Sequence, residues 1–307
     1  MNIEENLKRL LTKEELRMAE PLSNHTTFRI GGPADYYAVP KDIETLKKLI
    51  ECCRENNISY YILGRGSNVL FGDGGFRGVI IEVGKNLEQV EFLPEGKVRA
   101  QAGISLSKLA AALAERGLGG FEFASGIPGS LGGGITMNAG AYGGEMKDCL
   151  LEATVLDQSG NIQTLASKDL KLSYRHSTVM EEGHIVLEAV LQFTPGDQDA
   201  IRAQMKELNG RRKEKQPLEY PSAGSTFKRP EGYFAGKLIQ DAGLCGYSVG
   251  GAQVSEKHCG FVINRQSATA EDVQALIKDV QTIVKDKFGV TMEPEVRMVG
   301  QFNKVRS

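Results

Sequence analysis

Apolar residues recur along the chain at two spacings, one typical of helices and one typical of strands. The longest helical stripe runs from Thr269 to Phe288, and Gly289 directly after it is a typical helix-ending residue. Further helices are predicted over residues 2–19, 42–57, 105–116, 198–209 and 234–242. Short apolar runs bounded by turn residues predict strands over residues 34–39, 60–63, 78–83, 89–93, 97–102, 151–156, 162–165, 185–193 and 261–264. The pattern predicts a mixed α and β protein in which the charged, proline-bearing residues 211–221 form a linker.

Two of these helices begin at residues whose side chains can cap them. Asp42 can accept a hydrogen bond from the first turn of the helix that follows it. Thr269 and Asp272 have approximately the spacing of a capping box. Side-chain chemistry therefore supports the starts of both helices in addition to the apolar spacing.

Composition and charge narrow the class of protein. Of the 307 residues, 41% are hydrophobic and 25% are charged, which is typical of a folded globular chain. The formal net charge of −2 argues against a protein that binds nucleic acid or an anionic membrane surface. Every apolar run is far shorter than the ~18 residues that span a bilayer, and the amphipathic N-terminal stretch lacks the features of a secretory signal. We therefore expect a cytoplasmic protein, with no obligate protein partner evident from the sequence.

The cysteines and histidines suggest no metal site. Five cysteines are present, an odd number, and no two of them form a C-x-x-C pair. We expect reduced thiols, as is usual in the cytoplasm. The four histidines are scattered without the spacing of metal ligands. The prediction is a protein that binds no metal.

The chain has 36 glycines, and they are unevenly spread. Two clusters stand out, and the first follows the predicted strand at 60–63. Gly64-Arg65-Gly66-Ser67-Asn68 contains a G-x-G pattern, but the third glycine of a dinucleotide-binding fingerprint is missing. More turns and another strand follow where that motif requires a helix, so a Rossmann site is not expected. A glycine loop can still bind phosphate through its backbone N–H groups. A tight surface turn is the alternative interpretation.

The second cluster spans residues 117–144 and is rich in small residues. Ser125–Gly134 leads into Met137–Gly143 with few side chains large enough to fill a core. Such a segment suits a large flat ligand lying against the backbone. A glycine-rich turn that packs helices together is the alternative.

Six motifs together resemble one enzyme family. They are GRGSNVL, SGIPGSLGGGITMNAGAYGGE, YRHS, PSAGSTFKRP, GKLIQDAGLCGYSVGGAQVSEKHCGFVIN and EPEVR, which lie between about His25 and Arg297. In order and spacing they resemble the bacterial UDP-N-acetylenolpyruvoylglucosamine reductases. The resemblance implies a three-lobed α+β fold with FAD binding of the vanillyl-alcohol-oxidase/p-cresol-methylhydroxylase type. It implies FAD-binding lobes over residues 1–85 and 86–210, and a C-terminal α/β substrate domain over residues 211–307.

The resemblance also implies which residues hold FAD. The pyrophosphate would lie against Gly64, Arg65, Gly66, Ser67, Asn68, Ser125, Gly126, Ile127, Gly129 and Ser130, and the isoalloxazine near Asn138, Gly140 and Ala141. Neither glycine segment contains a His or Cys that could bond covalently to the flavin, so we expect non-covalent FAD. A side chain at Gly66 is expected to block the approach of the pyrophosphate and release the cofactor.

The implied reaction reduces the enolpyruvyl double bond of a UDP-sugar, UDP-N-acetylglucosamine enolpyruvate, with NADPH as co-substrate. A hydride reaches the terminal carbon and a proton reaches the carbon beside the carboxylate. Arg175 matches the family's arginine, whose rigid fork can hold a carboxylate and stabilise a developing enolate. Ser225 matches the proton donor, and Glu295 matches a glutamate that either shares its proton with the enolate or orients Arg175. Without the motifs, each of these residues would be interpreted as an ordinary surface or turn residue.

Lys228, Arg229 and Arg297 are expected to bind the substrate. Arg229 stands where many relatives carry asparagine, and the short stretch between Arg175 and Ser225 resembles the compact branch without a tyrosine-bearing lid. Two other functions are compatible with the same fold. One is an FAD-dependent oxidase of alcohols or sugars, and the other is a non-catalytic sensor of nucleotide sugars.

Overall fold

The computed structural model describes residues 3–302, which form two compact units. Within the described residues, the first unit comprises residues 3–17, 37–65 and 79–212, and the second comprises residues 18–36, 66–78 and 213–302. These units group residues by contact, so the three-lobe division expected from the sequence stays a prediction.

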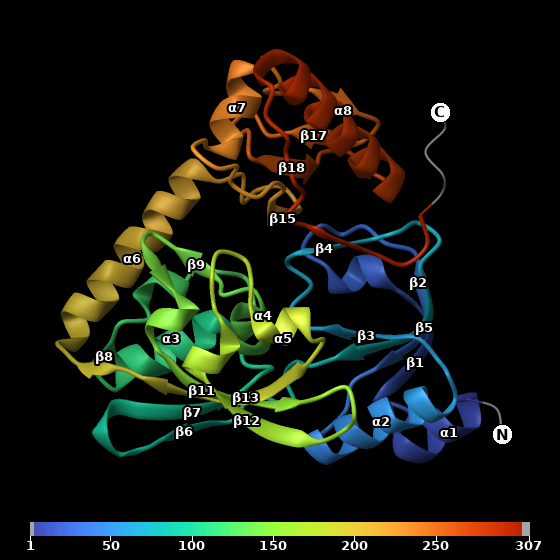
Figure 1. The fold of residues 1–307 in the computed structure, drawn as a ribbon, viewed down its shortest axis with the longest axis vertical. Helices are drawn as coiled ribbons and strands as arrows, with labels where there is room; N and C mark the ends of the chain where they lie inside the picture. The colour runs from blue at the N-terminus through green and yellow to red at the C-terminus, as the bar shows by residue number, and fades with distance from the viewer. Residues whose placement is uncertain (1–2, 303–307) are drawn as a thin grey trace. The chain divides into compact units, whose positions relative to one another are not determined.

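The first unit contains a five-stranded antiparallel sheet in the order β12-β11-β13-β7-β6, with helices beside it (Figure 1). Its helices are α1 (Ile3–Leu10), α2 (Ile43–Glu55), α3 (Leu106–Glu115), α4 (Leu131–Thr136) and α5 (Thr178–Glu181), with 3-10 turns η2 (Pro94–Gly96), η3 (Glu122–Ala124), η4 (Met146–Asp148) and η5 (Ser167–Leu170). Its strands are β3 (Tyr60–Leu63), β6 (Val90–Phe92), β7 (Lys97–Gln101), β8 (Leu118–Gly119), β9 (Gly140–Ala141), β10 (Gly144–Glu145), β11 (Leu150–Leu156), β12 (Ile162–Ala166), β13 (Ile185–Gln192) and β14 (Thr194–Pro195).

Four elements continue across the boundaries between the units: β1 (Leu16–Pro21), β2 (Pro33–Ala38), β5 (Phe76–Glu82) and α6 (Gln198–Lys215). A four-stranded sheet has the order β1-β2-β5-β3, and within it β3 runs parallel to β5.

The second unit is built on α8 (Ala270–Phe288) and an antiparallel sheet in the order β15-β18-β17-β16. The apolar stripe of α8 contributes Val273, Leu276, Ile277, Val280 and Val284 to the buried core, and the helix contacts β16 and β17. Figure 1 shows α8 beside β17. The remaining elements are η1 (Leu22–His25), β4 (Val69–Phe71), β15 (Ser222–Ser225), α7 (Ala235–Asp241), β16 (Ser248–Val249), β17 (Ala252–Val254), β18 (Phe261–Asn264) and β19 (Arg297–Val299).

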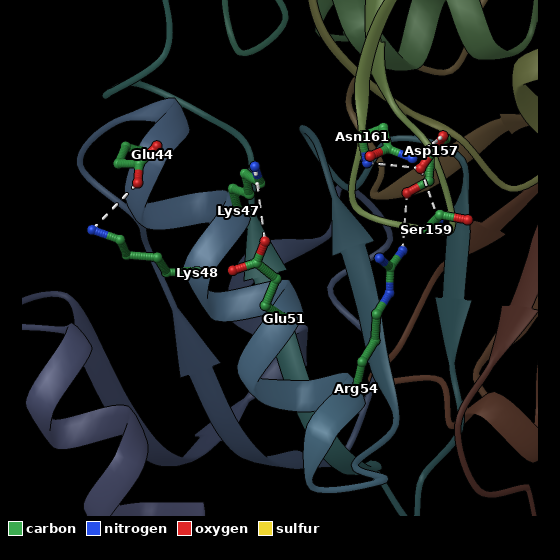
Figure 2. A network of polar contacts seen from close by, with 8 residues as sticks. All are labelled: Glu44, Lys47, Lys48, Glu51, Arg54, Asp157, Ser159 and Asn161. Carbon is green, nitrogen blue, oxygen red and sulfur yellow. Dashed lines mark hydrogen bonds and ion pairs between the residues drawn. The ribbon is translucent and has the colours of Figure 1, made fainter.

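A polar network joins α2 to the turn between β11 and β12 (Figure 2). The Arg54 guanidinium donates to the Asp157 carbonyl at 3.1 Å, although the two residues lie 103 positions apart in sequence. The Asp157 carboxylate in turn accepts the backbone N–H groups of Asn161 and Ser159, and these hydrogen bonds lower its pKa. Two chain segments far apart in sequence are thereby joined within the first unit.

Two expectations about the elements were wrong. The helix expected over 2–19 ends at Leu10, and residues 16–19 instead form part of β1 because they pair in the β1-β2-β5-β3 sheet; residue 2 lies outside the described residues. Residues 211–215 continue α6 instead of forming a linker. Their Arg, Lys and Glu side chains favour helix, and Pro217 disfavours helix at the residue before it.

Candidate active site

Gly64 of the first glycine cluster and Ser130 of the second are neighbours within the first unit. Gly64 directly follows β3, and a Cβ atom on it would lie 2.5 Å from the Ser130 Oγ. Ser130 is the N-cap of α4, and its hydroxyl accepts the N–H of Gly133. Residues that the sequence proposed separately as phosphate-binding are therefore neighbours, and a glycine at position 64 leaves room for the Ser130 hydroxyl.

A buried cation lies beside the second cluster. A Cβ atom on Gly126 would lie 2.3 Å from Asn209 Oδ1 and 3.0 Å from Arg212 Nη1, both on α6. Arg212 is 8% exposed, and among the described residues nothing accepts a hydrogen bond from its Nε. A bare backbone beside a buried guanidinium whose Nε has no acceptor suits an anionic group such as a pyrophosphate. Sequence reasoning missed Arg212 because it ended this helix at residue 209.

Gly66 is required by the fold itself. Its φ is +62°, and a Cβ atom would lie 2.0 Å from the His25 carbonyl oxygen. Its own carbonyl accepts the N–H of Thr27 at 3.0 Å. The expected effect of a side chain at this position therefore follows from backbone packing, without any reference to a bound pyrophosphate.

Asn138 lies at the end of α4 with a left-handed φ of +44° and is 1% exposed. Its Nδ2 donates to the Glu145 carboxylate and to the Ser173 carbonyl at 3.1 Å, and its Oδ1 accepts the Lys147 N–H at 3.0 Å. The side-chain amide is thus engaged within the protein. A contact between Asn138 and the flavin would have to come from the backbone. Gly140 and Ala141 follow as β9, in a tight hairpin with β10.

Arg175 lies in a tight turn of the first unit. Ser173 and His176 exchange backbone hydrogen bonds at 3.2 and 3.1 Å, so Tyr174 and Arg175 occupy the centre of the turn. Arg175 has a φ of +55° and is half-buried, and its guanidinium lies 5.0 Å from the centre of the Tyr174 ring. The turn presents a permanent cation on a constrained backbone.

Ser225 and Glu295 lie close together in the second unit. Ser225 ends β15 opposite Phe261 of β18, and the next carbonyl, that of Thr226, accepts the Glu295 N–H at 2.8 Å. The Lys228 N–H donates to the Glu293 carbonyl at 2.8 Å, which extends the same antiparallel pairing. The structure therefore brings together two predicted catalytic residues separated by 70 positions in sequence. Both are half-buried.

Asn68 connects the first glycine loop to this pair. Its Nδ2 donates to the Glu295 carbonyl at 3.2 Å, and its own carbonyl accepts the Arg297 N–H at 3.1 Å. Arg297 begins β19, which runs parallel to β4 in the register Arg297↔Val69. The strand begins only at Arg297, so Glu295 lies outside it. Asn68 thereby holds the backbone of a predicted catalytic residue.

The proposed substrate residues have partners on the surface of the second unit. The Lys228 ammonium pairs with the Glu293 carboxylate at 3.3 Å, and the Arg229 guanidinium lies 4.8 Å from the centre of the exposed Phe234 ring. Arg297 is exposed. Arg175 belongs to the first unit. The second unit holds the other predicted catalytic and substrate residues: Ser225, Lys228, Arg229, Glu295 and Arg297.

The expectation of reduced thiols was wrong for two of the five cysteines. Cys245 and Cys259 form a disulfide, because the loops that carry them bring their Cα atoms within 5.6 Å. Cys52, Cys53 and Cys149 are free and buried, and burial raises the pKa of Cys53 and of Cys149 to about 12. These thiols therefore stay protonated near neutral pH and are poor nucleophiles.

Between residues 3 and 302, no three His, Cys, Asp or Glu side chains are grouped so that they could hold a metal ion. Within the same residues, no helix has both the length and the apolar character to cross a bilayer.

Comparison with known families gives two matches. Residues 34–166 match the model of an FAD binding domain, and residues 216–299 match the C-terminal domain of UDP-N-acetylenolpyruvoylglucosamine reductase. The matches agree with the position of the glycine clusters in the first part of the chain and of the Ser225–Glu295 pair in the last part.

Individual relatives are similar along nearly their whole length. The chain is 55% identical over 300 residues to the UDP-N-acetylenolpyruvoylglucosamine reductase of Lachnoclostridium phytofermentans, covering 97% of each chain. It is 57% identical over 294 residues to that of Agathobacter rectalis, covering 92% of this chain and 93% of the relative. The crystal structure of the enzyme from Thermus caldophilus superposes with a TM-score of 0.78 at 32% identity, covering 92% and 98% of the two chains. The expected class, an α+β fold with FAD-binding and C-terminal parts, is confirmed.

Proposed function

The chain belongs to the UDP-N-acetylenolpyruvoylglucosamine reductase family, and on this basis we propose that Arg175, Ser225 and Glu295 carry out its reaction. The reaction is the FAD-dependent, NADPH-driven reduction of UDP-N-acetylglucosamine enolpyruvate to UDP-N-acetylmuramate, in peptidoglycan precursor synthesis. The observation that best supports the residue roles is the pairing that places Glu295 beside the segment that begins at Ser225.

Bound FAD supplies the hydride carrier between NADPH and the enolpyruvyl double bond. In the first unit, the neighbouring Gly64 and Ser130 and the bare backbone at Gly126 would hold its pyrophosphate, with Arg212 supplying positive charge. The remaining predicted contacts are Arg65, Gly66, Ser67, Asn68, Ser125, Ile127, Gly129, Gly140, Ala141 and the Asn138 backbone. Cys149, the cysteine nearest in sequence to the second glycine cluster, is buried and protonated, so we propose non-covalent binding.

Arg175 would bind the carboxylate of the enolpyruvyl group. A guanidinium offers two parallel N–H donors to a carboxylate and stays charged at every physiological pH. Negative charge grows on this carboxylate as the double bond is reduced. A fixed cation therefore stabilises the transition state more than the ground state.

Ser225 would donate the proton to the carbon beside the carboxylate. A serine hydroxyl is a weak acid, so it needs a neighbour that supplies or stabilises charge. Glu295 is brought near it by the hydrogen bond between its N–H and the Thr226 carbonyl. In our proposal Glu295 either holds a proton close to the developing enolate or fixes the orientation of the groups that bind it.

Lys228, Arg229 and Arg297 would bind the anionic nucleotide sugar. Lys228 and Arg229 share one short segment of the second unit with Ser225. A cytoplasmic location, without nucleic acid, membrane or obligate protein partners, completes the proposal. It rests on the nearly balanced charge of the chain and on the small-molecule nature of the reaction.

An anaerobic experiment with purified protein tests this function. NADPH should bleach the flavin absorbance, and the UDP-sugar enolpyruvate should restore it. An oxidase of the same fold would ignore NADPH, and in a separate aerobic assay it would consume oxygen with its own reducing substrate. A sensor would bind the nucleotide sugar without turnover, and a protein that stays colourless after FAD is added would contradict the proposal outright.

A further inference from the structure

The turn that carries Arg175 is fixed at both of its ends to the segment that ends α4. On one side, the Ser173 carbonyl accepts the Asn138 Nδ2 at 3.1 Å. On the other side, the Ser177 hydroxyl donates to the Thr136 carbonyl at 2.6 Å. The two hydrogen bonds bracket a four-residue turn whose central arginine has a left-handed φ. Such backbone conformations persist where the surrounding contacts hold them.

Both bracketing side chains are themselves held in place. Asn138 is 1% exposed, donates its second amide hydrogen to Glu145 and accepts the Lys147 N–H. Ser177 is 0% exposed and also caps α5 by accepting the Met180 N–H at 3.2 Å. Both side chains are buried and hydrogen-bonded within the protein, so their hydrogen bonds hold the Arg175 turn against the end of α4.

We propose that Asn138 and Ser177 are positioning residues that hold Arg175 in place for the substrate carboxylate. The inference rests on the proposed role of Arg175 and revises the role expected of Asn138, whose side chain acts on the Arg175 turn. Two parallel hydrogen bonds to a carboxylate require a fixed guanidinium direction. Displacement of a positioned group by about 1 Å can cost on the order of 10²-fold in rate.

The test separates the two halves of the reaction in Asn138→Ala and Ser177→Ala. Recovery of flavin absorbance on adding the UDP-sugar should slow about ten- to hundredfold. In Ser177→Ala, bleaching by NADPH and the FAD content of the purified protein should stay within about twofold of wild type, because neither needs Arg175 and Ser177 is not among the proposed FAD contacts. Two variants are used because Asn138 also supports the β9–β10 hairpin, so its loss could prevent folding.

Two control variants test whether the effect comes from the hydrogen bonds that Asn138 and Ser177 make to either side of the Arg175 turn. Ser173→Ala removes a side chain of the turn but keeps the carbonyl that accepts from Asn138, so it should behave as wild type. Ser177→Thr keeps the hydroxyl and should restore most of the rate lost in Ser177→Ala.

A double-mutant cycle gives the decisive comparison. If the Ser177 hydrogen bond acts through Arg175, flavin absorbance should recover no more slowly in Ser177→Ala combined with Arg175→Ala than in Arg175→Ala alone. Additive losses, or equal slowing of both half-reactions, would overturn the inference. If flavin absorbance recovers at the wild-type rate in Asn138→Ala and Ser177→Ala but slowly in Arg175→Ala, the positioning role of Asn138 and Ser177 is overturned and the role of Arg175 stands. Wild-type recovery in Arg175→Ala would overturn the proposed role of Arg175 together with it.

Discussion

Two glycines in the proposed cofactor segments differ in what a side chain at their position would contact. Gly66 has a φ of +62°, and a Cβ atom would lie 2.0 Å from the His25 carbonyl oxygen. A Cβ atom on Gly129 would make ordinary contacts, 3.5 Å from Leu106 Cδ1 and 3.8 Å from Ile127 Cγ2. The first glycine is required by the protein backbone, whereas the second has room for a methyl group unless a ligand lies against it.

We therefore expect Gly66→Ala and Gly129→Ala to fail in different ways. Gly66→Ala should destabilise the apoprotein by about 2 kcal/mol or more, because it adds both a clash and a disfavoured φ. Gly129→Ala should leave the melting temperature of the apoprotein unchanged and weaken FAD binding. Thermal unfolding of the apoproteins and FAD titrations measure the two effects. An apoprotein of Gly66→Ala with wild-type stability would contradict the packing argument.

Residue-level chemistry was predictable from the sequence only where the signal is local. The caps at Asp42 and Thr269 were predicted and are present. The burial of Arg212 and the three hydrogen bonds of the Asn138 side chain arise only in the folded chain, so spacing along the sequence carried no sign of them. The catalytic roles of Arg175, Ser225 and Glu295 came from motif resemblance and stay predictions.

At the scale of elements, α8 shows how a helix start is stabilised by several acceptors. The Asp272 carboxylate accepts the N–H groups of Thr269 and Gly251 at 3.0 and 3.1 Å, and Thr269 caps the Asp272 N–H in return. The Asp73 carboxylate also accepts two N–H groups of the first turn. Burial alone would raise the pKa of Asp272, but the hydrogen bonds together lower it.

The stability contributed by Asp272 should therefore depend on pH. Because its folded pKa is lowered, the contribution is present above the unfolded pKa and is lost as pH falls through the folded pKa. Asp272→Asn should cost about 1 kcal/mol at neutral pH and progressively less at acid pH. Urea unfolding at both pH values measures the difference.

Asp286→Asn, near the other end of the same helix, serves as a matched control. It removes an exposed carboxylate from the last turn, where negative charge is unfavourable, so stability should stay equal or rise slightly. If Asp272→Asn lowered the free energy of unfolding by the same amount at acid and neutral pH, the lowered pKa of Asp272 would not account for the loss of stability.

Elements with a strong local pattern were predicted well, and elements defined by distant pairing were not. β3, β18 and α8 have the predicted bounds, with Thr269 as the cap of α8. Residues 16–19 of β1 were predicted as helix from the local spacing of apolar residues. That prediction failed because pairing with other strands of the sheet overrides the local spacing. β19 was missed because its three residues form a strand only through pairing with β4, more than 200 positions earlier.

At the scale of the whole molecule, similarity over 97% of the chain confirms the family and with it the FAD-dependent reaction. The sequence also predicted that no Rossmann helix follows the first glycine loop, and β4 indeed begins directly after Asn68. The disulfide between Cys245 and Cys259 could not be predicted, because the two cysteines lie 14 positions apart and only the fold brings them together.

The central claim, that Ser225 delivers the proton, is tested most directly by Ser225→Ala in stopped-flow absorbance. Bleaching of the flavin by NADPH needs no proton on the substrate carbon, so it should stay near the wild-type rate. Recovery on adding the UDP-sugar should slow by about 10²–10⁴-fold, as is usual for loss of a positioned general acid. Ser222→Ala on the same strand keeps its backbone hydrogen bonds with Thr27 and should behave as wild type. Equal slowing of both phases, or recovery at the wild-type rate, would contradict the assignment of Ser225 as the proton donor.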